Sequence, residues 1–320
     1  MLQLLSRPRW INLLRSTALQ LFVLLNSLLL TPWARCQQLL YAANTRPALD
    51  AGVTFRSNAE EVRLTFTVTD QYRQPVTGLK PDQVVVFDGS EPANPTDFRA
   101  DSELPLHLAL LVDRSDSLSK YLTQEQRVAA QLATSLLRPE DQAFVAGFGT
   151  TMAPLEPLTA DGGAVGRVMD HRAKAELTAL FDALMQCAKE FPRSEERLER
   201  RAIILLSDGL DNYSMHSLTE VVEAAQRADI PIFAITVHST DGDSVLQALA
   251  ALTGGRMFTV SRSQSLESAF AEIERALRSQ YTVTFRPIDR NGKFHPLHLF
   301  VQGAEQARIQ ARSGYWAPAE

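Results

Sequence analysis

The sequence predicts an α/β fold: a doubly wound, mostly parallel sheet inserted into a small β-sandwich that both ends of the chain build together. Between residues 105 and 279, short apolar segments alternate with amphipathic helical segments, which is typical of a parallel sheet covered on both faces. On either side of that region, apolar and polar residues alternate with the two-residue period of half-buried strands. Because an isolated hairpin is marginal in water, we expect the terminal strands to join in one sandwich.

Residues 1–36 are predicted to be an export signal. Three arginines precede an apolar run of 13 residues, Ala18–Leu30, which is shorter than the roughly 20 residues of a spanning helix. Ala34 and Cys36 place small residues before a possible cleavage point, while Arg35 disfavours lipidation of the cysteine. We therefore expect an exported protein, periplasmic, on the cell surface or secreted. An uncleaved signal that anchors the chain in the membrane is the alternative.

Composition excludes some classes of partner and fold. The chain has 32 basic and 37 acidic residues, and removal of the four arginines in the signal changes its net charge from −5 to −9. A nucleic-acid-binding domain would show a basic field instead. Cys187 is the only cysteine after the signal, so no internal disulfide is expected. We expect it to be a packed residue of a helix rather than a reactive thiol.

The two parts of the sandwich are predicted to flank the α/β domain. Residues 37–52 lack periodicity and are expected to form a linker, and residues 53–104 the N-terminal part of the sandwich. The C-terminal part spans residues 280–320, where Asp289–Gly292 has the composition of a hairpin turn. The predicted strands are Val62–Val68, Val84–Phe87, Tyr281–Arg286, His298–Val301 and Ala307–Arg312.

The α/β domain is predicted to span residues 105–279. Its strands are expected at Leu106–Val112, Ala143–Phe148, Ala202–Leu206, Pro231–Val237 and Met257–Val260. Its helices are expected at Tyr121–Leu137, Thr178–Glu190, Leu218–Ala228, Ser244–Leu252 and Leu266–Leu277. Because β–α–β crossovers are right-handed, these strands should run parallel with helices on both faces.

Two polar segments follow predicted strands of this sheet. Asp113, Ser115 and Ser117 come directly after the first strand at two-residue spacing. Asp208 and Gly209 follow the strand Ala202–Leu206, and Asp208 is expected in the position that Asp113 occupies one strand away. Ligands of open α/β sheets bind at the carboxyl ends of the strands. Carboxylate and hydroxyl oxygens suit a hard cation, Mg²⁺, Mn²⁺ or Ca²⁺, better than zinc.

Together with Thr178, which precedes a predicted helix, these segments resemble the metal-ion-dependent adhesion site of von Willebrand factor A domains. More narrowly, residues 60–318 are similar to the VWFA-related proteins of acidobacteria. The further matching stretches are Val68–Asp70, Val76–Leu79, Thr178–Leu184, Thr253–Arg256, Arg278–Tyr281 and Arg312–Pro318.

The resemblance implies a function and a set of ligands. Ser115, Ser117 and Thr178 would offer hydroxyl oxygens to a divalent cation, with Mg²⁺ foremost, and Asp113 and Asp208 would bind it directly or through water. An Asp or Glu of a protein partner would fill an open coordination position, since a cation not fully neutralised by two carboxylates attracts a third. The protein would thus be an exported adhesion or protein-binding module and not an enzyme.

The chain departs from the family pattern directly before Thr178. Many relatives have Gly-Gly there, whereas this chain has Glu176 and Leu177. Glu176 could approach the metal and compete with a partner's carboxylate.

Other interpretations of the same residues remain open. Asp113 and the two serines could only cap the helix that follows the strand. Asp211 and Asn212 are expected to be turn residues rather than ligands, and His295 and His298 to be surface residues. A metal-dependent phosphohydrolase would need a second acid at Ser115. A passive assembly module without a functional metal is the other alternative.

Overall fold

The protein is described from a computed structural model, which divides into two units between residues 53 and 54. The described residues all belong to the second unit and span 61–115, 134–157, 177–191, 199–236, 241–261, 265–304 and 306–319. The predicted signal, the predicted linker, Ser117, Glu176 and most of the predicted helix Tyr121–Leu137 therefore lie outside them.

A six-stranded sheet lies at the centre of the α/β domain, with the strand order β10-β9-β8-β5-β6-β7. Its first five members run parallel and only the last pairs antiparallel, which confirms the predicted mostly parallel sheet. The strands are β5 (Leu106–Asp113), β6 (Gln142–Phe148), β7 (Glu156–Pro157), β8 (Arg200–Leu206), β9 (Ile232–Thr236) and β10 (Met257–Thr259).

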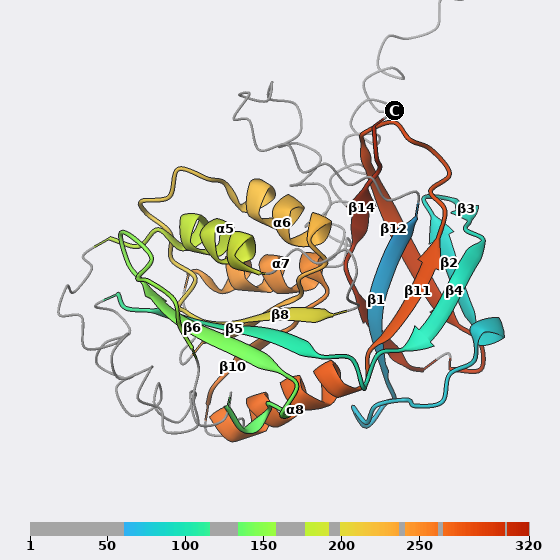
Figure 1. Ribbon diagram of the computed structural model, residues 1–320, viewed down its shortest axis with the longest axis horizontal. Coiled ribbons are helices and arrows are strands. Elements are labelled where there is room, and N and C mark those ends of the chain that lie inside the picture. The colour runs from blue at the N-terminus through green and yellow to red at the C-terminus, as the bar shows by residue number, and fades with distance from the viewer. Residues whose placement is uncertain are drawn as a thin grey trace, which may run out of the picture. The chain divides into compact units, whose positions relative to one another are not determined.

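Helices cover both faces of this sheet (Figure 1). On one face lie α5 (Leu180–Glu190), α6 (Leu218–Arg227) and α7 (Asp243–Thr253), and on the other lies α8 (Leu266–Arg278). All eight residues of β5 are buried, as a central strand between two helical layers requires. Among the helices of the described residues, none is both long and apolar enough to span a membrane.

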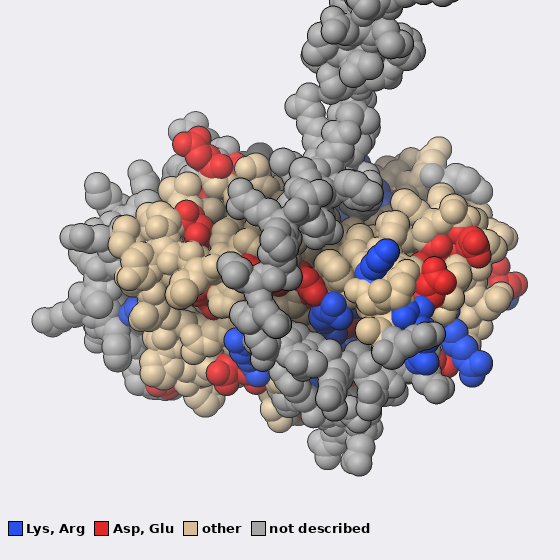
Figure 2. All heavy atoms as spheres, turned by 90° about the horizontal axis from the view of Figure 1, so that it is seen from above, with Lys and Arg blue, Asp and Glu red and all other residues tan. Residues whose placement is uncertain are grey.

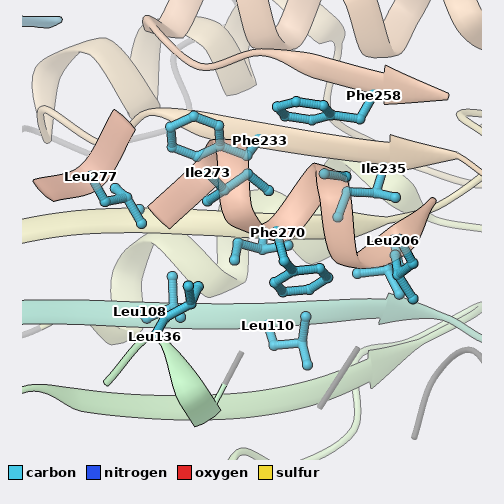
Figure 3. Packing of buried hydrophobic residues seen from close by; sticks show 14 of the residues in the cluster. Leu108, Leu110, Leu136, Leu206, Phe233, Ile235, Phe258, Phe270, Ile273 and Leu277 are labelled. Atoms are coloured by element: carbon cyan, nitrogen blue, oxygen red, sulfur yellow. The ribbon is translucent and has the colours of Figure 1, made fainter. Parts of the chain in front are cut away.

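The apolar side of α8 forms the core beneath the sheet (Figure 3). Phe270 and Ile273 of this helix belong to the same buried cluster as Leu108, Leu110 and Phe233 of the strands. Every second residue of β5 faces this cluster, because successive side chains of a strand point to opposite faces. On α5, Cys187 is fully buried and its burial raises the pKa of the thiol, which fits the predicted packed residue.

The terminal strands form two four-stranded antiparallel sheets, ordered β13-β1-β11-β4 and β14-β12-β2-β3. Each sheet combines strands from before and after the α/β domain, which confirms the predicted insertion. The strands are β1 (Val62–Thr69), β2 (Val84–Asp88), β3 (Glu91–Pro92), β4 (Pro95–Ala100), β11 (Tyr281–Phe285), β12 (Phe294–Val301), β13 (Arg308–Ala311) and β14 (Gly314–Trp316), with a short 3-10 helix at Pro81–Gln83. The two sheets share one buried apolar cluster that includes Phe66, Val86 and Phe285.

The predicted hairpin at Asp289–Gly292 is wrong. β11 pairs with β1 on one side and with β4 on the other, so no edge is left for β12. The chain instead crosses to the second sheet, where β12 pairs with β2 and β14. The turn residues are present, but they connect two sheets and not two neighbouring strands.

Buried polar contacts join the sandwich to the α/β domain. The guanidinium of Arg312 donates to the main-chain oxygens of Arg63 and Gln226 and lies 3.4 Å from the Asp229 carboxylate. Asp229 also accepts a hydrogen bond of 2.8 Å from the hydroxyl of Thr65 on β1. The strands from both ends of the chain are thus fixed to the C-terminal end of α6.

Candidate metal site

Asp113 lies at the carboxyl end of β5 and is fully buried. Its Oδ1 accepts a hydrogen bond of 2.9 Å from the main-chain N–H of Ser115, which closes a turn. Its Oδ2 accepts a hydrogen bond of 2.7 Å from the hydroxyl of Ser207. Both donors are neutral, so these bonds orient the carboxylate without balancing its charge.

The second acid comes from the neighbouring parallel strand. β5 and β8 are paired with Val112 opposite Leu206, so Asp113 lies beside Ser207 and not beside Asp208 as predicted. Asp208 is one residue further along and is also buried. The sequence pattern does not single out Ser207, whose hydroxyl joins the two strand ends, because its place opposite Asp113 follows only from the register of the strands.

The two acids influence each other electrostatically. Burial raises the pKa of Asp113 to about 6, against the lowering effect of its hydrogen bonds with Ser115 and Ser207. The nearby charge of Asp208 raises the pKa of Asp113 further. Two carboxylates that share a desolvated place favour either a proton or a cation between them.

Thr178 is brought to the same edge of the sheet by main-chain contacts. Its N–H donates to Oδ1 of Asn212 over 2.7 Å, and its carbonyl oxygen accepts from the N–H groups of Asn212 and Tyr213. The next amide, that of Ala179, donates to the carbonyl oxygen of Gly149, just after β6. Thr178 is buried and lies between the C-terminal end of β6 and the loop after β8.

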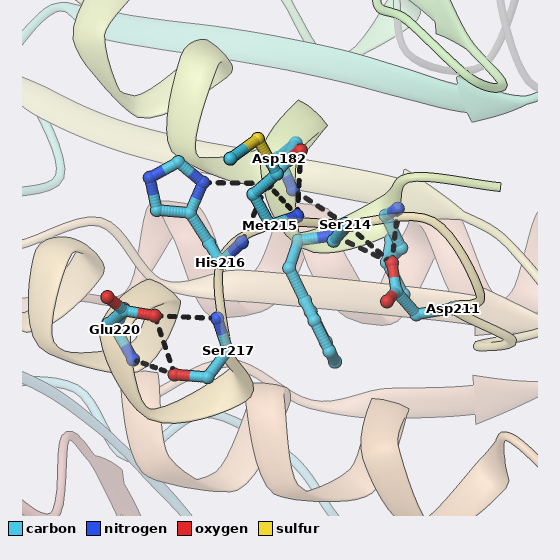
Figure 4. Close-up of polar contacts among 9 residues, drawn as sticks. Asp182, Asp211, Ser214, Met215, His216, Ser217 and Glu220 are labelled. Atoms are coloured by element: carbon cyan, nitrogen blue, oxygen red, sulfur yellow. Dashed lines mark hydrogen bonds and ion pairs between the residues drawn. The ribbon is translucent and has the colours of Figure 1, made fainter.

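The loop of residues 207–216 also caps α5. The residue before this helix is Ala179, whose methyl side chain cannot accept a hydrogen bond. The first N–H groups of the helix, which have no acceptor within the helix, therefore donate to side chains of the loop. Asp211 accepts from the N–H of Leu180 over 2.8 Å, and the hydroxyl of Ser214 accepts from the next two amides (Figure 4). Asp211 and Asn212 are expected from the sequence to be turn residues rather than ligands. Their side chains accept hydrogen bonds from Leu180 and Thr178, and they thus hold the segment that carries Thr178.

Asp182 completes this connection from the side of the helix. Its carboxylate accepts from the main-chain N–H groups of Met215 and His216 and lies 2.6 Å from the His216 ring (Figure 4). Burial acts to raise the pKa of Asp182, but the hydrogen bonds from His216 and Met215 outweigh it and the pKa lies below its usual value. Amides of α5 thus donate to side chains of the loop, and amides of the loop donate to a side chain of α5.

Two glycines allow the loops at this edge to approach closely. Gly209 has φ +78°, and a Cβ there would overlap the carbonyl oxygen of Gly242 and lie 2.7 Å from Cγ of Leu246. A Cβ on Gly242 would overlap the carbonyl oxygen of Asp208 and lie 2.7 Å from Cα of Gly209. The turn after Asp208 is consequently packed against the start of α7, which fixes the main chain beside the second acid.

The donor set fits a hard divalent cation. The described residues hold no group of three or more His, Cys, Asp or Glu side chains that could bind a metal. A cation at this edge would therefore depend on hydroxyl oxygens of Ser115 and Thr178 as well as on Asp113 and Asp208. All four are buried: Asp113, Ser115 and Asp208 lie at the carboxyl ends of the neighbouring strands β5 and β8, and Thr178 lies just before α5. Carboxylate and hydroxyl oxygens are ligands that suit Mg²⁺ and Ca²⁺.

The histidine pair lies far from this edge, on β12 of the sandwich. His298 is exposed, as expected. His295 is not a free surface residue: its Nδ1 lies 2.8 Å from the buried carboxylate of Asp88, and its Nε2 lies 3.1 Å from Oδ1 of Asn291. Tyr315 donates to the same carboxylate over 2.6 Å. This group fastens β12 and β14 to the end of β2.

Three solved structures illustrate the likeness to known folds. An aerotolerance-related membrane protein of Bacteroides fragilis is 15% identical, with a TM-score of 0.41, over 54% of this chain and 98% of that one. The von Willebrand factor domain of the type V pilus tip protein of Porphyromonas gingivalis is 13% identical, with a TM-score of 0.41, over 54% and 94%. Such distant likenesses say nothing of a shared function.

The third is proximal thread matrix protein 1 from the mussel byssus, in a form whose MIDAS motif is occupied by zinc. It is 19% identical, with a TM-score of 0.46, over 63% of this chain, and the chain spans half of its length. No curated protein matches the chain.

The family comparison covers more of the chain. The von Willebrand factor type A domain family matches residues 107–272, just over half of the sequence, from β5 to within α8. This range contains every residue of the candidate site and the whole six-stranded sheet except Leu106. The chain belongs to the von Willebrand factor type A domain family.

Proposed function

We propose that this protein is an exported, metal-dependent adhesion or protein-binding module and not an enzyme. Domains of its family commonly bind a metal ion at a MIDAS site and mediate protein interactions. The proposed ligands of the cation are Asp113, Ser115, Ser117, Thr178 and Asp208. Mg²⁺ is the proposed cation, with Mn²⁺ and Ca²⁺ as alternatives.

One observation carries the proposal: two carboxylates, Asp113 and Asp208, are buried at the ends of neighbouring strands, close enough for the charge of Asp208 to act on Asp113. Each charge loses hydration on burial, and the two repel each other. The donors to Asp113 are a hydroxyl and an amide, so neither supplies the opposite charge. A divalent cation would compensate both acids at once.

The residues around the pair have separate tasks. Ser207 and the amide of Ser115 fix the orientation of the Asp113 carboxylate. Asn212 and Asp211 position the segment of Thr178. A divalent cation bound there supplies positive charge and a coordination position for an Asp or Glu of a protein partner.

Charge argues against a nucleic acid as the partner. The chain is acidic, with a net charge of −5. On the face shown in Figure 2, the basic side chains of the described residues lie among acidic ones and form no broad basic field. We propose membrane attachment only through a retained N-terminal signal; export itself is tested by determining whether the N-terminus recovered from the cell envelope begins near Gln37.

Calorimetry tests the metal site directly. Mg²⁺, Mn²⁺ and Ca²⁺ are titrated into the wild type and into a double variant, Asp113→Ala with Ser115→Ala. Asp97→Ala removes a half-exposed carboxylate of the sandwich and serves as the matched control. Binding heat is expected in the wild type and the control and not in the double variant; equal heats in all three would refute the site.

Capture experiments separate a binding module from the alternatives. Proteins of the cell envelope are passed over the immobilised domain in Mg²⁺ and again in EDTA. Retention that Mg²⁺ supports and EDTA abolishes agrees with the proposal, whereas metal-independent retention favours a passive assembly module. Hydrolysis of a phosphate ester that Asp113→Asn abolishes would instead indicate an enzyme.

A further inference from the structure

Large exposed apolar side chains gather beside the candidate metal site. Seven such side chains are exposed in the described part of the chain, and four of them lie in two segments next to the site. The four are Leu177 (40% exposed), Leu210 (42%), Tyr213 (53%) and Met215 (93%). Single exposed apolar residues are ordinary, but a local concentration marks an interaction surface. We call these four residues the apolar rim.

Sequence position ties the rim to the proposed ligands. Leu177 directly precedes Thr178, and Leu210 lies two residues after Asp208. Tyr213 donates its main-chain N–H to the carbonyl oxygen of Thr178. The main chain of Leu177, Leu210 and Tyr213 therefore lies next to the proposed ligands, where a partner's carboxylate would approach the cation.

The rim is held on a well-connected main chain. The Thr178 segment and the 207–216 loop exchange hydrogen bonds through Asn212, Asp211 and Ser214. The N–H of Met215, the most exposed rim residue, donates over 3.1 Å to both carboxylate oxygens of Asp182. A fixed main chain lowers the entropy lost when the exposed side chains become ordered against a partner.

We propose that the apolar rim recognises a protein segment in which an acidic residue is flanked by bulky apolar side chains. This inference rests on the proposed function, because the cation would receive the acid. The rim adds affinity by burying apolar area on both partners, which the carboxylate alone cannot provide. The occupant is therefore an acidic-apolar peptide segment of another protein.

Selection from displayed peptides tests this inference. Two libraries of nine-residue peptides have random flanks around a central Asp or a central Asn, and the full chain is the bait in Mg²⁺ or in EDTA. From the Asp library in Mg²⁺, we expect Leu, Ile, Phe, Tyr and Trp next to the acid to be enriched about threefold or more. The Asn library is expected to yield no enrichment.

Matched variants then separate the rim from the cation site. Tyr213→Ser with Met215→Ser removes half of the rim, and Tyr72→Ser removes an aromatic side chain from a loop of the sandwich that is 74% exposed, against 53% for Tyr213. The strongest selected peptide is expected to bind the double variant about tenfold more weakly than wild type. Its affinity for Tyr72→Ser and the heat of Mg²⁺ binding to both variants are expected to stay unchanged.

The outcomes distinguish this inference from the proposed function. Acidic peptides selected in Mg²⁺ without apolar flanks would overturn the rim and leave the metal-dependent binding intact. Selection that persists in EDTA, or that occurs equally with the Asn library, contradicts both. A Mg²⁺-dependent dimer that the double variant abolishes would assign the rim to a second copy of the chain and overturn the peptide assignment. A selection that enriches nothing also overturns it.

Discussion

Alanine substitutions at three glycines measure how tightly the main chain is packed beside Asp208. Gly209 combines a left-handed backbone, φ +78°, with a close approach to Gly242. Gly242 has an ordinary φ of −78° but is crowded by the carbonyl oxygen of Asp208. Gly78 has φ +75°, and a Cβ there would meet nothing within 4 Å. Alanine at Gly78 therefore measures the cost of the left-handed backbone alone, and alanine at Gly242 the cost of crowding alone. Alanine at Gly209 measures the sum of the two.

The expected magnitudes follow from these geometries. Gly78→Ala is expected to lower the free energy of unfolding by about 1–2 kcal/mol, the cost of a left-handed alanine. Gly242→Ala is expected to lower it by about 1–3 kcal/mol, because main-chain atoms must move to admit the methyl group. Gly209→Ala carries both costs, about 2–5 kcal/mol in all.

Urea unfolding measures these costs, provided that the slope with denaturant stays constant among the variants. Mg²⁺ calorimetry provides the second measurement. The main chain at Asp208 must shift to relieve crowding, so Gly209→Ala and Gly242→Ala are expected to weaken Mg²⁺ binding while Gly78→Ala leaves it unchanged. A Gly209→Ala variant that is no less stable than Gly78→Ala and binds Mg²⁺ normally would refute the reasoning.

Three further substitutions probe the contacts around the site and the sandwich. Asp211→Ala removes the distant cap of α5 and is expected to cost about 1–2 kcal/mol in urea unfolding, whereas Asp211→Asn keeps an acceptor and most of the stability. Asp182→Asn is expected to cost about 1 kcal/mol at neutral pH. Because the folded pKa of Asp182 is lowered, this difference from wild type should shrink below about pH 4 and vanish once the wild-type carboxylate is protonated. Arg312→Met removes the buried guanidinium between the sandwich and α6, and thermal and urea unfolding should both show a loss of about 2–4 kcal/mol.

The sequence predicts the central sheet well because its strands are continuous apolar runs between helices. It does not predict β4, Pro95–Ala100, because a proline and charged residues are untypical of a strand. They are tolerated here because β4 lies at the edge of its sheet. The one-residue offset between Asp113 and Asp208 depends on the pairing of two strands, and no local pattern encodes it. The cap of α5 cannot be predicted from local sequence either, since Asp211 lies 31 residues from Leu180, whose N–H donates to it.

Two of the stretches that carry the narrower family resemblance, Thr253–Arg256 and Arg312–Pro318, pack against each other. Gly254 follows α7 with φ +86°, and a Cβ there would lie 2.8 Å from the main-chain N of Arg312. Ser313 donates its N–H to the carbonyl oxygen of Leu252, and Gln226 donates to the same oxygen and to the hydroxyl of Ser313. These two stretches therefore belong to the junction between the sandwich and the α/β domain, whereas Thr178–Leu184 belongs to the candidate metal site.

This placement bears on where binding specificity is encoded. A junction fixes how the two parts of the second unit fit together, so its residues are constrained by packing whatever the partner is. The apolar rim, by contrast, is exposed and lies outside the Thr253–Arg256 and Arg312–Pro318 stretches. The junction stretches thus place no constraint on Leu177, Leu210, Tyr213 and Met215, and we expect the choice of partner to depend on these four exposed residues.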